Sequence, residues 1–95
     1  MAEITVKLFG VYRSDTHLAS VKMNAARVID IFDEINRLAG EVYAEKAKAD
    51  PSLPKPEQVR FKDALLYIDG EKCSKQSREL KDGEEIWVMS PASGG

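Results

Sequence analysis

The chain has 95 residues, of which 43% are hydrophobic and 32% are charged, and its formal net charge is −2. These totals predict one small soluble domain and argue against nucleic acid or an anionic membrane as its main partner. The single cysteine, Cys73, excludes an internal disulfide or a cysteine zinc site and favours the reducing cytoplasm. We expect neither a signal peptide nor a membrane span, because no long apolar segment is present.

The N-terminal part predicts a β-hairpin. Residues 4–9 alternate with period two and are rich in β-branched side chains, which is typical of a strand with one buried face. Residues 11–23 are interpreted as a turn, with Ser14 and Asp15 near the bend, followed by a second strand. One face of the first strand then holds Ile4, Val6 and Leu8, and the other holds Thr5, Lys7 and Phe9.

An amphipathic helix is predicted after Asn24, which is a plausible cap. Apolar residues then recur every three or four positions, as on the buried side of a helix. Gly40 offers an early end, but the helix formers in residues 41–49 favour continuation to a stop before Pro51. The predicted apolar stripe consists of Val28, Ile31, Phe32, Ile35, Leu38, Ala39 and Val42.

The second half predicts a loop, a hairpin and a final strand. Residues 50–58 hold three prolines within six positions and are expected to form a loop, with one helical turn opened by Pro56. Residues 64–74 form a strand, an Asp-Gly turn and a strand, and residues 79–90 repeat an Asp-Gly turn before a strand at 86–90. The fold class is therefore α+β, with the helix packed on one face of a sheet of four to five strands.

Three stretches resemble the ubiquitin-like β-grasp sulfur carriers of the MoaD/ThiS type. They are "ITVKLFGVYR", "VIDIFDEINRLAG" and the ending "LKDGEEIWVMSPASGG", and together they place the likeness at residues 3–42 and 63–95. The closest pattern is the small subunit of molybdopterin synthase, with the thiamine sulfur carrier as a sister family. The resemblance implies a mixed β-grasp sheet at 1–90, a flexible Gly-Gly tail at 91–95 and an insertion at 43–62.

The resemblance also implies a chemistry for the tail. An E1-like adenylating enzyme uses ATP to join the Gly95 carboxylate to AMP, and a sulfur donor protein then displaces AMP to leave a C-terminal thiocarboxylate. That sulfur passes to a precursor in the active site of the large subunit of molybdopterin synthase, on the way to the molybdenum or tungsten cofactor. The carrier itself binds no cofactor and no metal, and it is not catalytic alone.

The tail residues suit that role. Gly94 and Gly95 lack a Cβ atom, so that backbone and nucleotide can approach closely, and Pro91, Ala92 and Ser93 add no charge. Pro91 also ends strand pairing at a set place, and an extended tail of five residues reaches roughly 17 Å. The alternative is that the two glycines are a frayed end or a cloning scar without function.

A docking surface is predicted beside the tail. If Ile86 and Val88 face the helix, then Trp87 and Met89 face outward, and Phe9 shares their side of the sheet. An exposed aromatic and methionine cluster on an open sheet is typical of a partner-binding surface. The alternative is a reversed register in which Trp87 belongs to the core.

Other candidate residues carry weaker signals. Lys72, Lys75, Arg78 and Lys81 lie close in sequence and either meet an acidic partner or form a solvated turn region. Cys73 is interpreted as a half-buried strand residue rather than a sulfur relay, and His17 as a surface turn residue. No acid–base pair, Ser–His–Asp set or nucleotide-binding loop is recognisable.

Three alternatives to the molybdopterin function remain open. The same carrier could feed a thiazole precursor or another sulfur acceptor. The Gly95 carboxyl could instead be joined to lysine amines, as in a ubiquitin-like modifier. The chain could also be a non-covalent interaction domain, which would keep its partner and activity after loss of Gly94 and Gly95.

Overall fold

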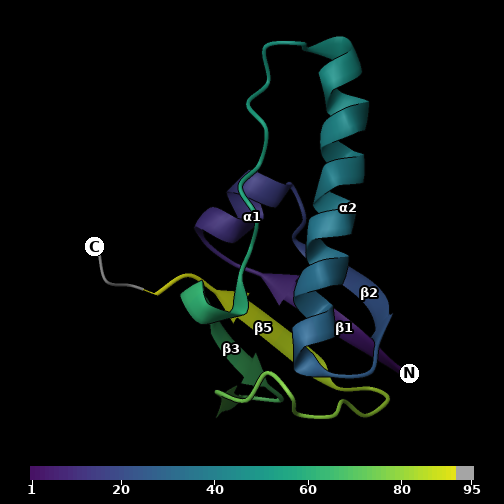
Figure 1. Ribbon diagram of the computed structural model, residues 1–95, viewed down its shortest axis with the longest axis vertical. Coiled ribbons are helices and arrows are strands. Elements are labelled where there is room, and N and C mark those ends of the chain that lie inside the picture. Colours follow the sequence, from purple (N-terminus) through teal and green to yellow (C-terminus); the bar gives the residue numbers. More distant parts are fainter. Residues whose placement is uncertain (92–95) are drawn as a thin grey trace.

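The computed structural model describes residues 1–91 and shows a five-stranded sheet with one long helix packed on one face (Figure 1). The strand order is β2-β1-β5-β3-β4, so the last strand of the chain lies in the centre. The elements are β1 (Ala2–Leu8), α1 (Val11–Thr16), β2 (Ser20–Ala25), α2 (Val28–Ala49), the 3₁₀ turn η1 (Phe61–Asp63), β3 (Leu65–Ile68), β4 (Glu71–Cys73) and β5 (Glu85–Met89).

The sheet is mixed. β1 is antiparallel to β2 and parallel to β5, whereas β3 is antiparallel to both β5 and β4. The parallel pair places the end of β5 beside the end of β1, with Leu8 opposite Val88. The predicted α+β class, the N-terminal hairpin and the mixed sheet with one main helix are therefore confirmed. The final strand runs one residue earlier than predicted, from Glu85 to Met89.

The connection between β1 and β2 differs from the prediction, because it contains the six-residue helix α1 instead of a simple turn. Ser14 and Asp15 lie inside this helix and not at a bend. Thr16 anchors it: this side chain is buried, its Oγ1 donates to the Tyr12 carbonyl at 2.7 Å and accepts from the Leu18 amide at 3.2 Å. A buried hydroxyl with both bonds satisfied costs little, so a short helix is stable here.

The long helix α2 follows the predicted apolar stripe. Its buried side chains, Val28, Ile31, Phe32, Ile35 and Ala39, cover the inner face of the sheet, and Leu38 and Val42 are half-buried beside them. The helix continues through Gly40 to Ala49, as predicted.

The predicted cap Asn24 is wrong. Asn24 lies in β2, opposite Glu3 of β1. Arg27 is the N-cap, and its backbone amide donates to Asp30 Oδ2 at 3.0 Å. Strand pairing with β1 extends through Ala25, so the chain turns into the helix three residues later than the sequence pattern indicated.

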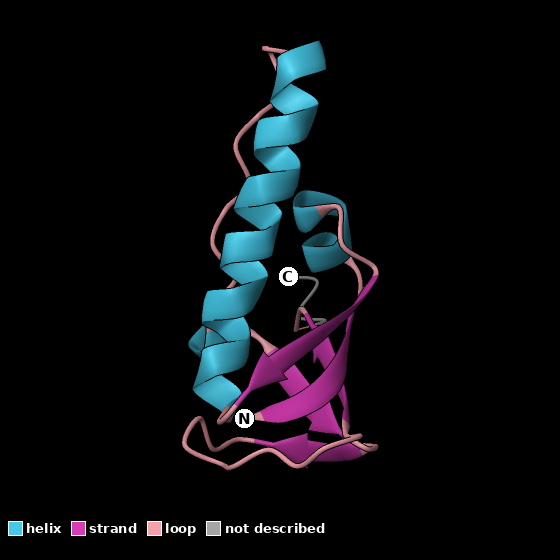
Figure 2. Ribbon diagram, turned by 90° about the vertical axis from the view of Figure 1, so that its right-hand side faces the viewer, coloured by secondary structure: helices cyan, strands magenta, loops and turns pink. Residues whose placement is uncertain are grey.

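The last turns of α2 extend beyond the sheet, and residues 50–60 return along the helix (Figures 1 and 2). Asn36 fastens this returning segment: its Nδ2 donates to the Val59 carbonyl at 3.0 Å, and its Oδ1 accepts from the Val59 amide at 2.8 Å. Val59 is buried as a result. The predicted helical turn at Pro56 is instead the 3₁₀ turn η1, which begins at Phe61, because the preceding residues run extended along α2.

Both Asp-Gly turns are present and tied to neighbouring strands. Asp69 and Gly70 have positive φ angles of 49° and 88°, the conformation that a two-residue hairpin loop requires. The Asp69 carboxylate accepts from the Glu85 amide at 2.9 Å, and the Asp82 carboxylate accepts from the Glu3 amide at 2.8 Å. No helix within residues 1–91 is long and apolar enough to cross a membrane.

Candidate functional site

The candidate site lies where β5 ends and the chain leaves the sheet. β5 is the central strand, held by β1 on one side and β3 on the other up to Val88 and Met89, so two neighbours fix the point at which the chain leaves the sheet before Ser90 and Pro91. Pro91 is exposed. The other predicted tail residues, Ala92, Ser93, Gly94 and Gly95, lie outside the described residues, and their roles stay predictions.

The two faces of β5 are those predicted from the alternation. Ile86 and Val88 are fully buried beneath α2, whereas Trp87 is 38% exposed on the opposite face. Met89 is half-buried on the same outer face as Trp87. The alternative register, with Trp87 in the core, is therefore excluded. The use of this face for docking is not decided by its exposure and stays a prediction.

Phe9 lies against Trp87, as the sequence predicted for residues on one face. The two rings form an edge-to-face pair, with centroids 5.7 Å apart and planes at 68°. Phe9 follows the end of β1, but its backbone amide still donates to the Val88 carbonyl at 3.0 Å, which extends the pairing with β5. Such an aromatic pair stabilises each ring's position by about 0.5–1.5 kcal/mol beyond its buried area.

The register adds residues that the sequence did not single out. Tyr67 of β3 pairs with Trp87, and Leu65 pairs with Met89, and both side chains are half-buried. The alternation of side chains along residues 65–68 indicates that every second residue of this strand faces outward. Only the pairing of β3 with β5 places these two side chains beside the predicted cluster. We call Phe9, Leu65, Tyr67, Trp87 and Met89 the outer apolar surface.

A charged pair borders the outer apolar surface. Glu85 Oε1 accepts from Trp87 Nε1 at 2.7 Å and lies 3.0 Å from Lys7 Nζ. The hydrogen bond from Trp87, followed by that from Lys7, lowers the pKa of Glu85 below its ordinary value. At neutral pH the carboxylate is therefore charged and holds both partners.

Gly10, which follows β1, lies close to Ser90, where the chain leaves β5. Its φ of +61° is a conformation that favours glycine, and a Cβ built there would lie 3.4 Å from Ser90 Oγ. This glycine lets the chain turn from β1 into α1 directly beside the last residues of β5. Val11, the next residue, is 51% exposed. Neither Gly10 nor Val11 was identified from the sequence.

The remaining candidates do not gather at the tail. Cys73 is half-buried, and its thiol donates a hydrogen bond to the Lys75 carbonyl, with the Sγ atom 3.5 Å from the oxygen. Arg78 is engaged by Glu84, but it still lines a hollow of about 200 Å³ together with the exposed Lys72 and Lys75.

His17 is the left-handed residue that ends α1. It is exposed, as expected for a surface turn residue. Among residues 1–91, no three His, Cys, Asp or Glu side chains are arranged to hold a metal ion.

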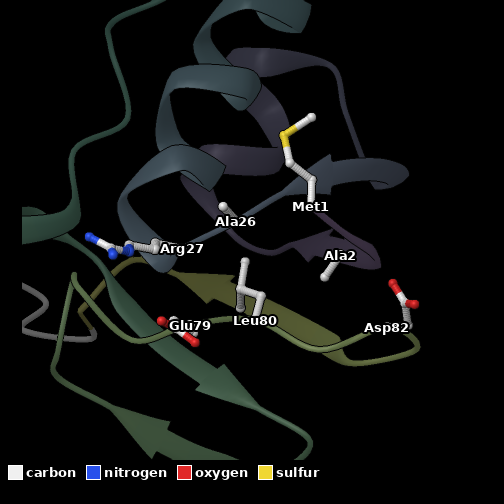
Figure 3. A pocket seen from close by; sticks show the side chains of 7 residues that line it. All are labelled: Met1, Ala2, Ala26, Arg27, Glu79, Leu80 and Asp82. Atoms are coloured by element: carbon white, nitrogen blue, oxygen red, sulfur yellow. The ribbon is translucent and has the colours of Figure 1, made fainter.

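A hollow of about 420 Å³ lies at the other end of the sheet (Figure 3). It is lined by Met1, Ala2, Ala26, Arg27, Glu79, Leu80 and Asp82. The parallel register puts Ala2 at the end of β1 remote from Leu8 and Val88. This hollow is therefore separate from the place where the tail begins.

Several solved structures share the fold over nearly the whole chain. The small archaeal modifier protein 1 (SAMP1) from Methanosarcina acetivorans is 25% identical, with a TM-score of 0.68, and the match covers 100% of this chain and 98% of that one. A putative molybdopterin converting factor, subunit 1, from Pyrococcus furiosus is 24% identical, with a TM-score of 0.65 and coverages of 96% and 99%.

A third structural relative comes from a protein complex. A chain of the BexX/CysO complex from Amycolatopsis orientalis is 24% identical, with a TM-score of 0.57 and coverages of 97% and 99%. No protein-family model and no curated protein matches the chain. The structural relatives share the architecture of this chain and confirm the β-grasp fold that the resemblance to ubiquitin-like sulfur carriers implied.

Proposed function

We propose that this chain is a ubiquitin-like sulfur carrier whose Gly95 carboxylate is activated and converted to a thiocarboxylate, and that it serves as the small subunit of a molybdopterin synthase. The observation that carries the proposal is the position of β5. The central strand β5 ends beside the outer apolar surface, and the chain leaves the sheet there at Pro91. A putative molybdopterin converting factor subunit shares this fold. A rigid strand that ends next to a docking surface suits a reaction carried out in a partner's active site.

The chemistry needs two displacements at the tail. An oxygen of the Gly95 carboxylate attacks the α-phosphorus of ATP, and pyrophosphate leaves. A hydrosulfide equivalent supplied by a donor protein then attacks the acyl carbon, AMP leaves, and loss of a proton gives the thiocarboxylate. Transfer of the sulfur to the acceptor and hydrolysis restore the carboxylate, so the carrier returns for another cycle.

This chain's own contribution is positioning. Gly10 and the pairing of β5 with β1 and β3 fix the point from which the tail departs. Five extended residues would span roughly 17 Å from there. The outer apolar surface supplies the contact that brings an activating enzyme or a large synthase subunit to that point. The cytoplasm suits this chemistry, because its reducing conditions preserve thiols such as Cys73.

A second candidate function is a protein modifier. The relative from Methanosarcina acetivorans carries that name, and its match covers this whole chain. In this function a lysine amine, instead of sulfur, attacks the same acyl-adenylate and forms an isopeptide bond. The two functions share the first step and differ in the nucleophile.

The deciding experiment is the mass of the C-terminal peptide after purification from the native host. Sulfur in place of one oxygen, confined to the peptide that ends at Gly95, supports the carrier function. Gly95 joined to lysines of other proteins supports the modifier function instead.

A reconstitution extends the test, because a thiocarboxylate hydrolyses during purification. The host's activating enzyme should exchange pyrophosphate into ATP when the intact chain is present and fail with a chain that lacks Gly94 and Gly95. A Glu45→Ala chain, altered on an exposed side chain at the far end of α2, is the matched control and should behave as the intact chain. An unmodified terminus together with no exchange would overturn the proposal.

A further inference from the structure

The indole of Trp87 is held in one orientation although its ring is exposed. Its Nε1 donates to Glu85 Oε1 at 2.7 Å, and its ring meets Phe9 edge-on. Trp has two side-chain torsions, so one polar contact and one ring contact on different parts of the indole are enough to fix it. An exposed aromatic ring without such contacts would sample several rotamers.

Glu85 can hold the indole because of its place in the strand. Residues two apart on a strand point to the same face, which puts Glu85 and Trp87 side by side. Lys7 lies opposite Trp87 in the parallel register with β1, and its ammonium group reaches the same carboxylate oxygen at 3.0 Å. The ion pair with Lys7 of β1 therefore holds the Glu85 carboxylate in the position from which it accepts the indole hydrogen bond.

We propose that Glu85 is a positioning residue that orients Trp87 for partner binding, and this inference rests on the proposed function. A side chain that is already ordered loses less entropy when a partner covers it, which improves binding without any new contact. The indole N–H is also satisfied within the chain. The partner surface that covers Trp87 therefore needs no hydrogen-bond acceptor for the indole.

The first test uses the protein alone. Trp87 is the only tryptophan, so fluorescence anisotropy and emission report on this one ring. Glu85→Ala should lower the anisotropy of the indole, whereas Glu85→Gln, whose carboxamide oxygen still accepts the N–H bond, should restore most of it. Glu45→Ala removes another exposed, lysine-paired carboxylate and serves as the matched control. Equal anisotropy in Glu85→Ala and the unaltered chain would overturn the inference.

The second test measures adenylation of the same variants by the host's activating enzyme. Glu85→Ala should raise KM by about 2- to 10-fold, the effect of ordering one side chain on binding, and leave kcat unchanged. Glu85→Gln should recover most of the loss. If the unaltered chain is adenylated and Glu85→Ala matches it in KM, the inference fails while the proposed function stands. If the unaltered chain is not adenylated, the proposed function fails, and the anisotropy result alone decides whether Glu85 orients the ring.

Discussion

The two faces of β5 carry neighbouring residues with opposite tasks. Ile86 and Val88 point toward α2 and are buried, whereas Glu85, Trp87 and Met89 point outward; Glu84, which directly precedes the strand, is also buried. The inner residues pack the core, and the outer residues form or border an open surface beside the tail. The alternating side chains of β5 thus connect the buried core with the outer apolar surface, which is proposed to bind partners.

Two consecutive glutamates make the difference concrete. Glu84 accepts two bonds from the Arg78 guanidinium, at 3.0 and 3.2 Å, and one from the Lys81 amide at 2.8 Å, which closes residues 78–84 onto the core. Glu85 binds one indole and one ammonium group on the surface. Both carboxyls have a lowered pKa, so a shifted pKa alone does not distinguish a structural carboxylate from one that orients a surface residue.

The largest effect is expected on the inner face. Ile86→Ala should lower the free energy of unfolding by about 2–5 kcal/mol, because it removes a fully buried side chain and leaves a cavity under α2. Chemical denaturation monitored by circular dichroism measures the loss. A loss as small as that of an exposed residue would contradict the assignment of this face to the core.

A smaller loss is expected for Glu84→Gln, about 1–3 kcal/mol at neutral pH, because the Gln NH₂ group cannot accept from Arg78. The variant should also change the pH dependence of stability. The Arg78 hydrogen bond lowers the pKa of Glu84 in the folded state below its ordinary value of 4.5. Its contribution is therefore complete above that value and is lost as the pH falls through the folded-state pKa.

Thermal melting between about pH 7 and pH 3 measures this pH dependence. The difference in Tm between the unaltered chain and Glu84→Gln should shrink on acidification. Other carboxyls titrate in both proteins and cancel in the comparison. A difference that stays constant down to the lowest pH would show that the Glu84 charge contributes nothing.

A loss of stability smaller than that of Ile86→Ala is expected for Trp87→Ala, since the residue is 38% exposed; the edge-to-face pair with Phe9 accounts for about 0.5–1.5 kcal/mol of it. Partner binding should instead weaken clearly in pull-down or adenylation assays. A loss of stability as large as that of Ile86→Ala would mean that Trp87 belongs to the core and not to a docking surface.

Much of the fold follows from local patterns. Alternation in residues 4–9 and in the strand predicted at 86–90, the apolar stripe of α2 and the Asp69-Gly70 turn each predicted the type of element that formed, because buried faces and positive φ angles select residue types directly. The exposure of Phe9 and Trp87 on one face followed in the same way. These signals are local, and each needs only a few neighbouring residues.

Features that depend on distant partners were missed. Helix α1 is fixed by Thr16 and by the Tyr12 hydroxyl, which donates to the Asp63 carbonyl 51 residues away at 2.8 Å. Asn36 looks like any polar helix residue until the returning segment brings Val59 against it. The cap at Arg27 was misplaced because strand pairing with β1 extended β2 past Asn24.

Local sequence patterns were enough to predict most of the strands, the long helix α2 and the apolar side of each, since those choices depend on side chains close together in the chain. The folded arrangement was needed to show that β5 is the central strand, that Tyr67 and Leu65 join Trp87 and Met89, and that Glu85 is shared by Lys7 and the indole. Strand order and register are set by packing between segments far apart in sequence, where no local pattern carries the information.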